Sequence, residues 1–318
     1  MRIAILDDYH GVATHYADWS VLGPQASLTV FREPLPEGAA RAAALEPFDV
    51  IVAMRERTPF PAELVYALPN LRLLVTTGIR NYAIDMAACA VCGVRVSTAP
   101  GHALAVEATS ELSWAMILAL FKRLPQENAN MHEGLWQTGM PTVLAGRRLG
   151  VVGLGRMGTA VARMGLAFNM DVVAWSPNLI EERAAQAGVK RVGKEELFAT
   201  SDVVSVHMPL SERSWHIVDA AALGAMQSTA FLVNTSRAGL VDEAALMTAL
   251  CQGRLAGAGL DVYGVEPLPA DAPIRSLPNV VLTPHLGYVS QINFESFYRN
   301  AVEAIAAWVA GVPIRVLS

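Results

Sequence analysis

The stretch that decides the fold runs from Leu149 to Ala162 and reads LGVVGLGRMGTAVA. A hydrophobic run leads into the pattern G-x-G-x-x-G, and an alanine-rich helical stretch follows it. Gly153 permits a tight turn, Gly155 lets the backbone approach a pyrophosphate, and Gly158 lets the helix pack close to the strand. Free N–H groups at the start of the helix would bind the phosphates. Because a second strand is expected at 171–175, we favour a dinucleotide-binding loop over an ordinary strand–turn–helix.

The end of that second strand bears on the choice of dinucleotide. The chain continues there as Trp175-Ser176-Pro177, and Ser176 stands where a carboxylate usually binds the adenosine ribose of NAD. Loss of the carboxylate removes its repulsion of a 2′-phosphate. The nearest base along the chain, Arg183, follows two glutamates. NAD and NADP therefore both stay open, and we expect weak discrimination between them.

The rest of the chain alternates short β-branched runs with Ala- and Leu-rich stretches, which is typical of parallel α/β folds. Nearly continuous apolar runs predict strands that are buried on both sheet faces. The expected strands before the glycine loop are Ile3–Leu6, Leu28–Phe31, Val50–Ala53, Leu73–Thr76 and Val94–Ser97. Those from the loop onward are Leu149–Val152, Val172–Trp175, Val203–His207, Phe231–Asn234, Leu255–Asp261 and Val280–Thr283. Expected helices are Ala39–Leu45, Pro61–Leu68, an almost wholly apolar one at Ala103–Arg123, and Phe294–Ala310.

The composition of the chain restricts the classes of protein to which it can belong. The 318 residues suggest two domains, and 53% hydrophobic residues suffice for sizeable cores. The net charge is −5, with no basic stripe of the kind that nucleic-acid binders use. The most apolar segment, Leu112–Leu124, falls short of the about 20 residues that span a bilayer. The N-terminus reaches charge after four apolar residues, which indicates a strand and not a secretory signal.

Cysteine and histidine usage points away from metal and redox sites. Three cysteines give no disulfide framework, so a reducing cytoplasm is expected. Cys89 and Cys92 form a C-x-x-C pair, but no second pair completes a zinc site, and we favour two small core residues. No histidine pair has metal-ligand spacing such as H-E-x-x-H. The sequence therefore predicts no bound metal.

Three later segments each place an ionisable residue just after an expected strand. They read NTSRAGLVDE from residue 234, GLDVYGVEP from 259 and LPNVVLTPHLGY from 277. Parallel α/β sheets gather their ligands at the carboxyl ends of the strands. An imidazole such as His285 suits proton transfer near neutral pH, and a carboxylate such as Glu266 can fix its tautomer. The planar fork of Arg237 can donate two parallel hydrogen bonds to a carboxylate. Each residue alone would indicate only a surface charge or a structural histidine, so the set of three carries the prediction.

With the glycine loop, these segments closely resemble the D-isomer-specific 2-hydroxyacid dehydrogenase family over essentially the whole chain. The resemblance implies that Arg237 binds the substrate carboxylate, that Glu266 pairs with the catalytic histidine, and that His285 is the general acid/base. The implied reaction is hydride transfer between NAD(P)H and a small 2-keto acid or D-2-hydroxy acid, such as glyoxylate, hydroxypyruvate or a larger one. Glu266 argues against the formate-oxidising branch, which has glutamine there. The alternative is a dinucleotide-sensing protein like the family's corepressors, although no long disordered tail is present.

The resemblance implies further site residues. Gly78 and Ile79 match a loop whose backbone N–H groups bind the substrate carboxylate, although Arg80 replaces its usual second glycine. Arg55 is a further candidate anion contact, with a solvated charge cluster as the alternative, and Tyr288 would narrow the pocket or bond to the substrate. Asp261 matches an aspartate that contacts the nicotinamide carboxamide, or else caps a helix, and His207 lies near the cofactor or only packs a strand. The predicted cofactor-binding residues are Gly153, Gly155, Arg156, Met157, Gly158, Ser176, His207, Pro209, Thr235 and Asp261.

The family architecture implies two doubly wound parallel-sheet domains. A Rossmann-type cofactor domain, residues 101–286, is expected to be inserted into a flavodoxin-like substrate domain formed by residues 1–100 plus 287–318. The apolar helix at 103–123 resembles the family's dimerisation element. We therefore expect a cytoplasmic homodimer whose partner molecule is a small 2-keto or 2-hydroxy acid, with neither nucleic acid nor membrane as a partner.

Overall fold

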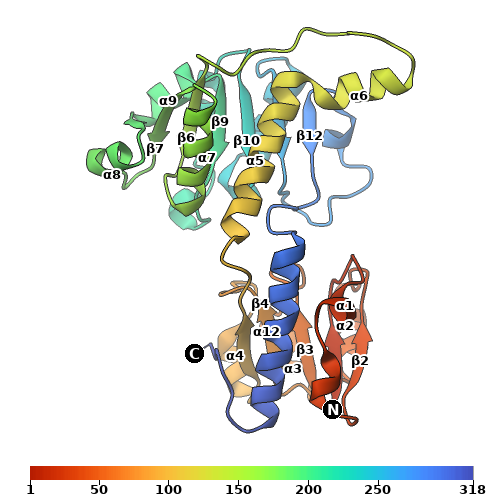
Figure 1. The fold of residues 1–318 in the computed structure, drawn as a ribbon. Helices are drawn as coiled ribbons and strands as arrows, with labels where there is room; N and C mark the ends of the chain where they lie inside the picture. Colours follow the sequence, from red (N-terminus) through yellow and green to blue (C-terminus); the bar gives the residue numbers. More distant parts are fainter. Residues whose placement is uncertain (318) are drawn as a thin grey trace. The chain divides into compact units, whose positions relative to one another are not determined.

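The computed structural model describes residues 1–317, which form two compact units (Figure 1). The first unit is Met1–Ala105 together with the chain from Ser290 onward, and the second is Val106–Val289. Each unit is built on one parallel sheet with helices packed against it. The predicted α/β class with two parallel sheets is confirmed.

The sheet of the first unit has five strands in the order β2-β1-β3-β4-β5, which is the flavodoxin-like order. Its strands are β1 Arg2–Ile5, β2 Ser27–Val30, β3 Val50–Ala53, β4 Leu73–Thr77 and β5 Arg95–Ala99. Its helices are α1 Ala13–Tyr16, η1 Trp19–Leu22, α2 Ala39–Leu45, α3 Ala62–Tyr66, α4 Met86–Val91 and α12 Gln291–Val309.

The C-terminal helix belongs to this first unit although the rest of the unit precedes residue 106. Helix α12 packs on β4 and β5, and the side chains of Phe297 and Ile305 are buried there. The Asn293 Oδ1 accepts a hydrogen bond from the His102 N–H at 3.0 Å. After the helix, the N–H of Leu317 donates to the Val96 carbonyl. These contacts return the end of the chain to the sheet that its beginning forms.

The sheet of the second unit has seven strands in the order β12-β11-β10-β9-β6-β7-β8, a Rossmann order extended by one strand. Its strands are β6 Arg148–Val152, β7 Asp171–Trp175, β8 Lys190–Arg191, β9 Val203–Val206, β10 Phe231–Asn234, β11 Gly257–Leu260 and β12 Val280–Leu282. Its helices are α5 Ala105–Lys122, α6 Leu124–His132, α7 Arg156–Ala167, α8 Glu181–Gln186, α9 Lys194–Thr200, η2 Glu212–Ser214, α10 Ala220–Ala225, η3 Ala238–Leu240, α11 Glu243–Cys251 and η4 Pro273–Ser276.

Both faces of the seven-stranded sheet are covered, which explains the continuous apolar runs of its strands. Val151 packs in a cluster with side chains of α5, α7 and α8, whereas its neighbour Val152 packs with those of α9, α10 and α11. The apolar composition of α5 has the same cause, because Trp114 and Ile117 of that helix are buried in the first cluster. Helix α6, in contrast, has no buried residue.

Three further observations on residues 1–317 concern membrane spans, metal sites and the cysteine pair. No helix among residues 1–317 combines the length and apolar character needed to cross a membrane. Within the same residues, no group of three or more His, Cys, Asp or Glu side chains is arranged to hold a metal ion. Cys89 is buried in α4, and its burial raises the pKa of the thiol to about 11. A thiol that resists ionisation fits the interpretation of Cys89 as a core residue.

Candidate active site

The glycine loop between β6 and α7 has the geometry that its sequence predicts. Gly153 has a φ of +95°, which side chains rarely tolerate, and a Cβ there would lie 2.5 Å from the His207 carbonyl oxygen. A Cβ on Gly158 would collide with the Gly153 carbonyl oxygen. Among the described residues, no atom outside Gly155, its chain neighbours and the adjoining backbone lies within 4 Å of the place where a Cβ of Gly155 would be. The first and third glycines are therefore required for packing, and the second leaves open space at the start of α7.

Helix α7 begins at this open space. Gly155 is its N-cap residue and makes no side-chain capping hydrogen bond, while Arg156 and Met157 form its first turn. The helix has 12 residues, so its aligned peptide dipoles place partial positive charge beside the loop. An N-terminus of this kind suits a phosphate group.

His207, a buried residue at the end of β9, lies next to the glycine loop. Its Nε2 is 2.7 Å from the Ser205 Oγ, but its Nδ1 has no hydrogen-bond partner among residues 1–317. Burial lowers the pKa of His207 to about 4, so the ring is neutral near pH 7. Pro209, two residues on, accepts a hydrogen bond from the Ser214 hydroxyl. The unsatisfied ring nitrogen and the open space over Gly155 both fit a polar ligand such as a dinucleotide.

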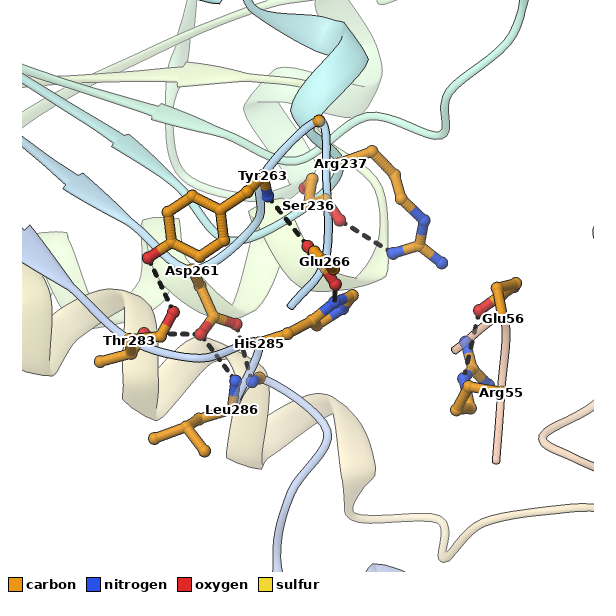
Figure 2. A network of polar contacts seen from close by, with 12 residues as sticks. Arg55, Glu56, Ser236, Arg237, Asp261, Tyr263, Glu266, Thr283, His285 and Leu286 are labelled. Carbon is orange, nitrogen blue, oxygen red and sulfur yellow. Dashed lines mark hydrogen bonds and ion pairs between the residues drawn. The ribbon is translucent and has the colours of Figure 1, made fainter. Parts of the chain in front are cut away.

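Glu266 and His285 form a tight pair beyond the ends of β11 and β12 (Figure 2). The His285 Nδ1 lies 2.6 Å from the Glu266 Oε2, and the other carboxylate oxygen accepts from the Tyr263 N–H at 2.9 Å. Burial acts to raise the pKa of Glu266, but its hydrogen bonds and the charges of His285 and Arg237 outweigh burial and lower that pKa. The carboxylate is thus charged and oriented toward the imidazole.

Asp261 holds the loop that carries His285. Its Oδ1 accepts hydrogen bonds from the Thr283 hydroxyl at 2.5 Å and the Leu286 N–H at 2.6 Å. Its Oδ2 accepts from the Gly287 N–H at 2.8 Å. Burial raises the pKa of Asp261 even though these donors oppose the rise. His285 itself has a φ of 53°, so the carboxylate stabilises a left-handed backbone that the residue would rarely adopt alone.

Arg237 follows β10 and lies on the same side of this sheet edge as Glu266 (Figure 2). Its Nη1 donates to the Ser236 carbonyl at 2.8 Å, and its own carbonyl accepts from the Asn234 side chain. Its charge contributes to lowering the pKa of Glu266. The neighbouring Thr235 hydroxyl is 2.8 Å from the Ser113 hydroxyl of α5. The three candidate residues of the signature segments are therefore gathered at one edge of one sheet.

Tyr288 belongs to the same unit and packs against the histidine. The two rings have centroids 5.3 Å apart and meet edge to face at 79°. Its position beside His285 fits the expectation that it narrows the space around the imidazole.

The first unit carries its own candidate site at the ends of β3 and β4. Arg55 has a φ of 55°, and its guanidinium occupies the place where a Cβ of Gly78 would be. Its N–H donates to the Thr77 hydroxyl at 2.9 Å, and its carbonyl accepts from the Asn81 side chain at 2.6 Å. Ile79, next to Gly78, is 68% exposed. The Gly78 N–H is taken by the Ala99 carbonyl and is therefore not available to a ligand.

Comparison with known proteins identifies the family to which this chain belongs. Residues 114–287 match the family described as D-isomer specific 2-hydroxyacid dehydrogenase, NAD binding domain. The chain is also 35% identical over 259 residues to a glyoxylate reductase from Korarchaeum cryptofilum, covering 80% of this chain and 77% of that protein. The chain belongs to the D-isomer-specific 2-hydroxyacid dehydrogenase family. This confirms the resemblance and the NAD-binding character of the glycine-loop unit.

Two further relatives show how much of each protein's length is similar to this chain. A D-3-phosphoglycerate dehydrogenase from Archaeoglobus fulgidus is 35% identical over 266 residues, which are 83% of this chain but 50% of that protein. The chain thus spans about half the length of this relative. The crystal structure of a phosphoglycerate oxidoreductase from Vibrio cholerae o395 aligns with a TM-score of 0.91 and 36% identity, covering 98% of this chain and 99% of that one.

The sequence patterns did not identify two residues of the second unit, Glu243 and Arg191, as part of the candidate site. The Glu243 Oε1 accepts a hydrogen bond at 2.8 Å from the Gly264 N–H, in the turn that orients Glu266. Arg191 of β8 reaches the turn that begins at Ser176. Glu243 lies in a signature segment, but its partner is 21 residues away, and Arg191 lies in a strand without an apolar run. Only the packing of the elements shows these contacts.

Proposed function

We propose that this chain is an NAD(P)-dependent oxidoreductase that interconverts a small 2-keto acid and its D-2-hydroxy acid. The observation that carries the proposal is the 2.6 Å contact between the His285 Nδ1 and the Glu266 carboxylate. It supplies a positioned acid/base group at the same sheet edge as Arg237. The 2-hydroxyacid oxidoreductases of the family support the same reaction class.

The cofactor site is assigned to the second unit. A bound nicotinamide dinucleotide would supply or accept the hydride at C2 of the substrate. The glycine loop and the first turn of α7 would hold its pyrophosphate, and the unsatisfied Nδ1 of His207 would face a polar group of the ligand. The residues proposed to hold the dinucleotide are Gly153, Gly155, Arg156, Met157, Gly158, Ser176, His207, Pro209, Thr235 and Asp261. Asp261 acts in part indirectly, since its carboxylate bonds to the His285 loop.

His285 would hold and move the proton. Because its Nδ1 faces Glu266, the Nε2 is the nitrogen left to exchange a proton with the substrate oxygen. In keto-acid reduction the Nε2–H donates to the oxygen at C2, and in oxidation the neutral Nε2 accepts the hydroxyl proton. The negative charge of Glu266 stabilises the imidazolium of the acid form. Tyr288 limits the room beside the ring.

The substrate carboxylate would be bound by fixed donors. Arg237 can donate two parallel hydrogen bonds to it, which also sets the orientation of C2. In the first unit, the Ile79 N–H is the candidate donor, because the Gly78 N–H is taken by the Ala99 carbonyl, and Arg55 adds a positive charge beside Gly78. We assign these loop donors to the substrate domain, residues 1–100 plus 287–318 in the sequence-based division, and Arg237 and the dinucleotide site to the cofactor domain, residues 101–286.

We also propose that the enzyme is a homodimer. Helix α6 has no buried residue, and its end and the loop after it expose Met131, Trp136, Met140 and Val143, with Met140 exposed to 89%. Apolar side chains of this number on one segment indicate a protein contact. Light scattering of the purified chain should give twice the mass of one chain. A monomer at micromolar concentration would exclude the dimer.

The reaction is tested by following the absorbance of NADH and NADPH with a panel of 2-keto acids, including glyoxylate and hydroxypyruvate. We expect turnover with at least one acid and, in the reverse direction, oxidation of the D but not the L hydroxy acid. Tight dinucleotide binding without turnover on any member would contradict the enzyme and favour a dinucleotide-sensing protein. The panel also identifies the substrate.

A further inference from the structure

The turn after β7 is where the adenosine ribose of a dinucleotide would lie in the proposed cofactor site. The Leu179 N–H donates to the Ser176 carbonyl at 3.1 Å and closes a four-residue turn. Ser176 is half-buried and takes the place of the carboxylate that usually binds the ribose hydroxyls of NAD. The turn therefore carries no negative side chain at its first position.

Strand β8 brings an arginine to this turn. In the parallel pairing of β7 with β8, Arg191 lies opposite Ala174, two residues before Ser176. Its Nε donates to the Leu179 carbonyl at 2.7 Å. Because Leu179 is bonded back to Ser176, the guanidinium lies against the turn that starts at Ser176. A separation of 12 residues along the chain hides this contact from sequence reasoning.

The charge of this arginine is not neutralised within the protein. Among residues 1–317, Arg191 forms no ion pair, and its Nη atoms make no hydrogen bond. Glu181 and Glu182, the nearest acids after the turn, lie in the first turn of α8 and pair with no base there. The bond through Nε orients the guanidinium and leaves the edge between its two Nη atoms for an anion. Planar forks of this kind match phosphate oxygens.

We propose that Arg191 and the Ser176–Leu179 turn form a subsite for the 2′-phosphate of NADP(H). The inference rests on the proposed dinucleotide binding and makes it more specific. Ser176 removes the repulsion that a carboxylate would exert, and Arg191 adds the attraction that the nearest base along the chain, Arg183, does not supply. The weak discrimination expected from the sequence is therefore revised to a preference for NADP(H).

The subsite can be tested by calorimetric binding of two small probes to the full chain, without any turnover. Adenosine 2′,5′-bisphosphate carries the 2′-phosphate, and 5′-AMP lacks it. We expect the wild type to bind the bisphosphate about tenfold or more tightly than 5′-AMP, as one charge-assisted phosphate contact implies. Arg191→Gln should weaken bisphosphate binding about tenfold and leave 5′-AMP binding unchanged. Arg191→Lys, which keeps the charge but loses the fork, should fall between the two.

Matched variants separate this site from general charge effects. Arg183→Gln removes a positive charge from the same loop–helix segment and should not change the ratio of the two affinities. Ser176→Asp should reverse the preference toward 5′-AMP. Thermal melting of each variant confirms that it is folded.

The outcomes distinguish the inference from the function on which it rests. Equal binding of both probes by the wild type, or an unchanged ratio in Arg191→Gln, would overturn the phosphate subsite while leaving the dinucleotide site intact. Failure of 5′-AMP, the bisphosphate, NAD and NADP all to bind would overturn the dinucleotide site itself, and the subsite with it.

Discussion

The carboxyl edges of the two sheets present a charged or ionisable residue in the same rare conformation. His285 at the edge of the second sheet has a φ of 53°, and Arg55 at the edge of the first has a φ of 55°. Such backbones cost about 1 kcal/mol or more for residues with a side chain. Each is held by hydrogen bonds from its surroundings: the carboxylate of Asp261 for the His285 loop, and the neutral side chains of Thr77 and Asn81 for Arg55.

The two residues differ in how closely an acidic side chain approaches them. His285 meets Glu266 at 2.6 Å, which is a short, charge-assisted hydrogen bond. Arg55 and Glu56 are 3.7 Å apart, beyond hydrogen-bonding distance (Figure 2). The first arrangement fixes one tautomer for proton transfer. The second fixes the backbone of Arg55 and places its guanidinium beside Gly78.

Loss of the proton-transfer group should have the largest effect. His285→Gln keeps a polar side chain of similar size but cannot donate and accept a proton at the same atom. We expect kcat for keto-acid reduction to fall about 100-fold or more. Steady-state kinetics measures the loss, and dinucleotide binding should be unchanged. A kcat within a few fold of the wild type would remove His285 from the reaction.

Loss of the proposed anion contact at Arg55 should weaken binding of the keto acid. Arg55→Met retains the apolar stem of the side chain but removes the charge, and we expect KM for the keto acid to rise about tenfold with little change in kcat. Arg95→Gln, which changes an exposed arginine at the amino end of β5, is the matched control. An unchanged KM in Arg55→Met would leave Arg55 as part of a solvated charge cluster.

Glu243 should have a smaller effect, because it acts on Glu266 only through the turn at Gly264. Glu243→Ala removes the acceptor for the Gly264 N–H, and we expect kcat to fall about three- to tenfold with KM nearly constant. Glu243→Gln retains an acceptor oxygen and should restore most of the activity. Equal losses in the two variants would show that the hydrogen bond does not position the turn.

The smallest effect is on stability and depends on pH. The pKa of Glu266 lies below its ordinary value of 4.5, so its ionised form favours the folded state above that pH. As pH falls through the lowered pKa, this contribution is lost. In urea unfolding, the stability difference between the wild type and Glu266→Gln should therefore shrink as pH falls below about 5. A difference that grows on acidification below about pH 5 would contradict the sign of the shift.

Sequence patterns predicted the elements whose residues are apolar and consecutive. The strand at Val50–Ala53 and the helix at Ala39–Leu45 have the expected bounds. Strand β8 was missed because Lys190 and Arg191 are charged and exposed, and helix α6 because its residues bury no apolar face. The motifs located Arg237, Glu266 and His285, since each follows a strand directly.

The contacts that complete the two sites depend on register and packing. The guanidinium of Arg55 meets Gly78 only because Ala53 pairs with Thr76 in the sheet. Glu243 reaches Gly264 across 21 residues, and Arg191 reaches Leu179 from a neighbouring strand. No spacing rule in one sequence encodes such distances.

A double-mutant cycle on the Glu266–His285 pair tests most directly whether the two residues work as one proton-transfer unit. The kcat/KM for keto-acid reduction is measured for the wild type, Glu266→Gln, His285→Gln and the double variant. Since Glu266 acts through His285, the double variant should be no more than about twofold slower than His285→Gln alone. If the two losses multiply instead, the carboxylate and the imidazole act independently, and the proposed pair is wrong.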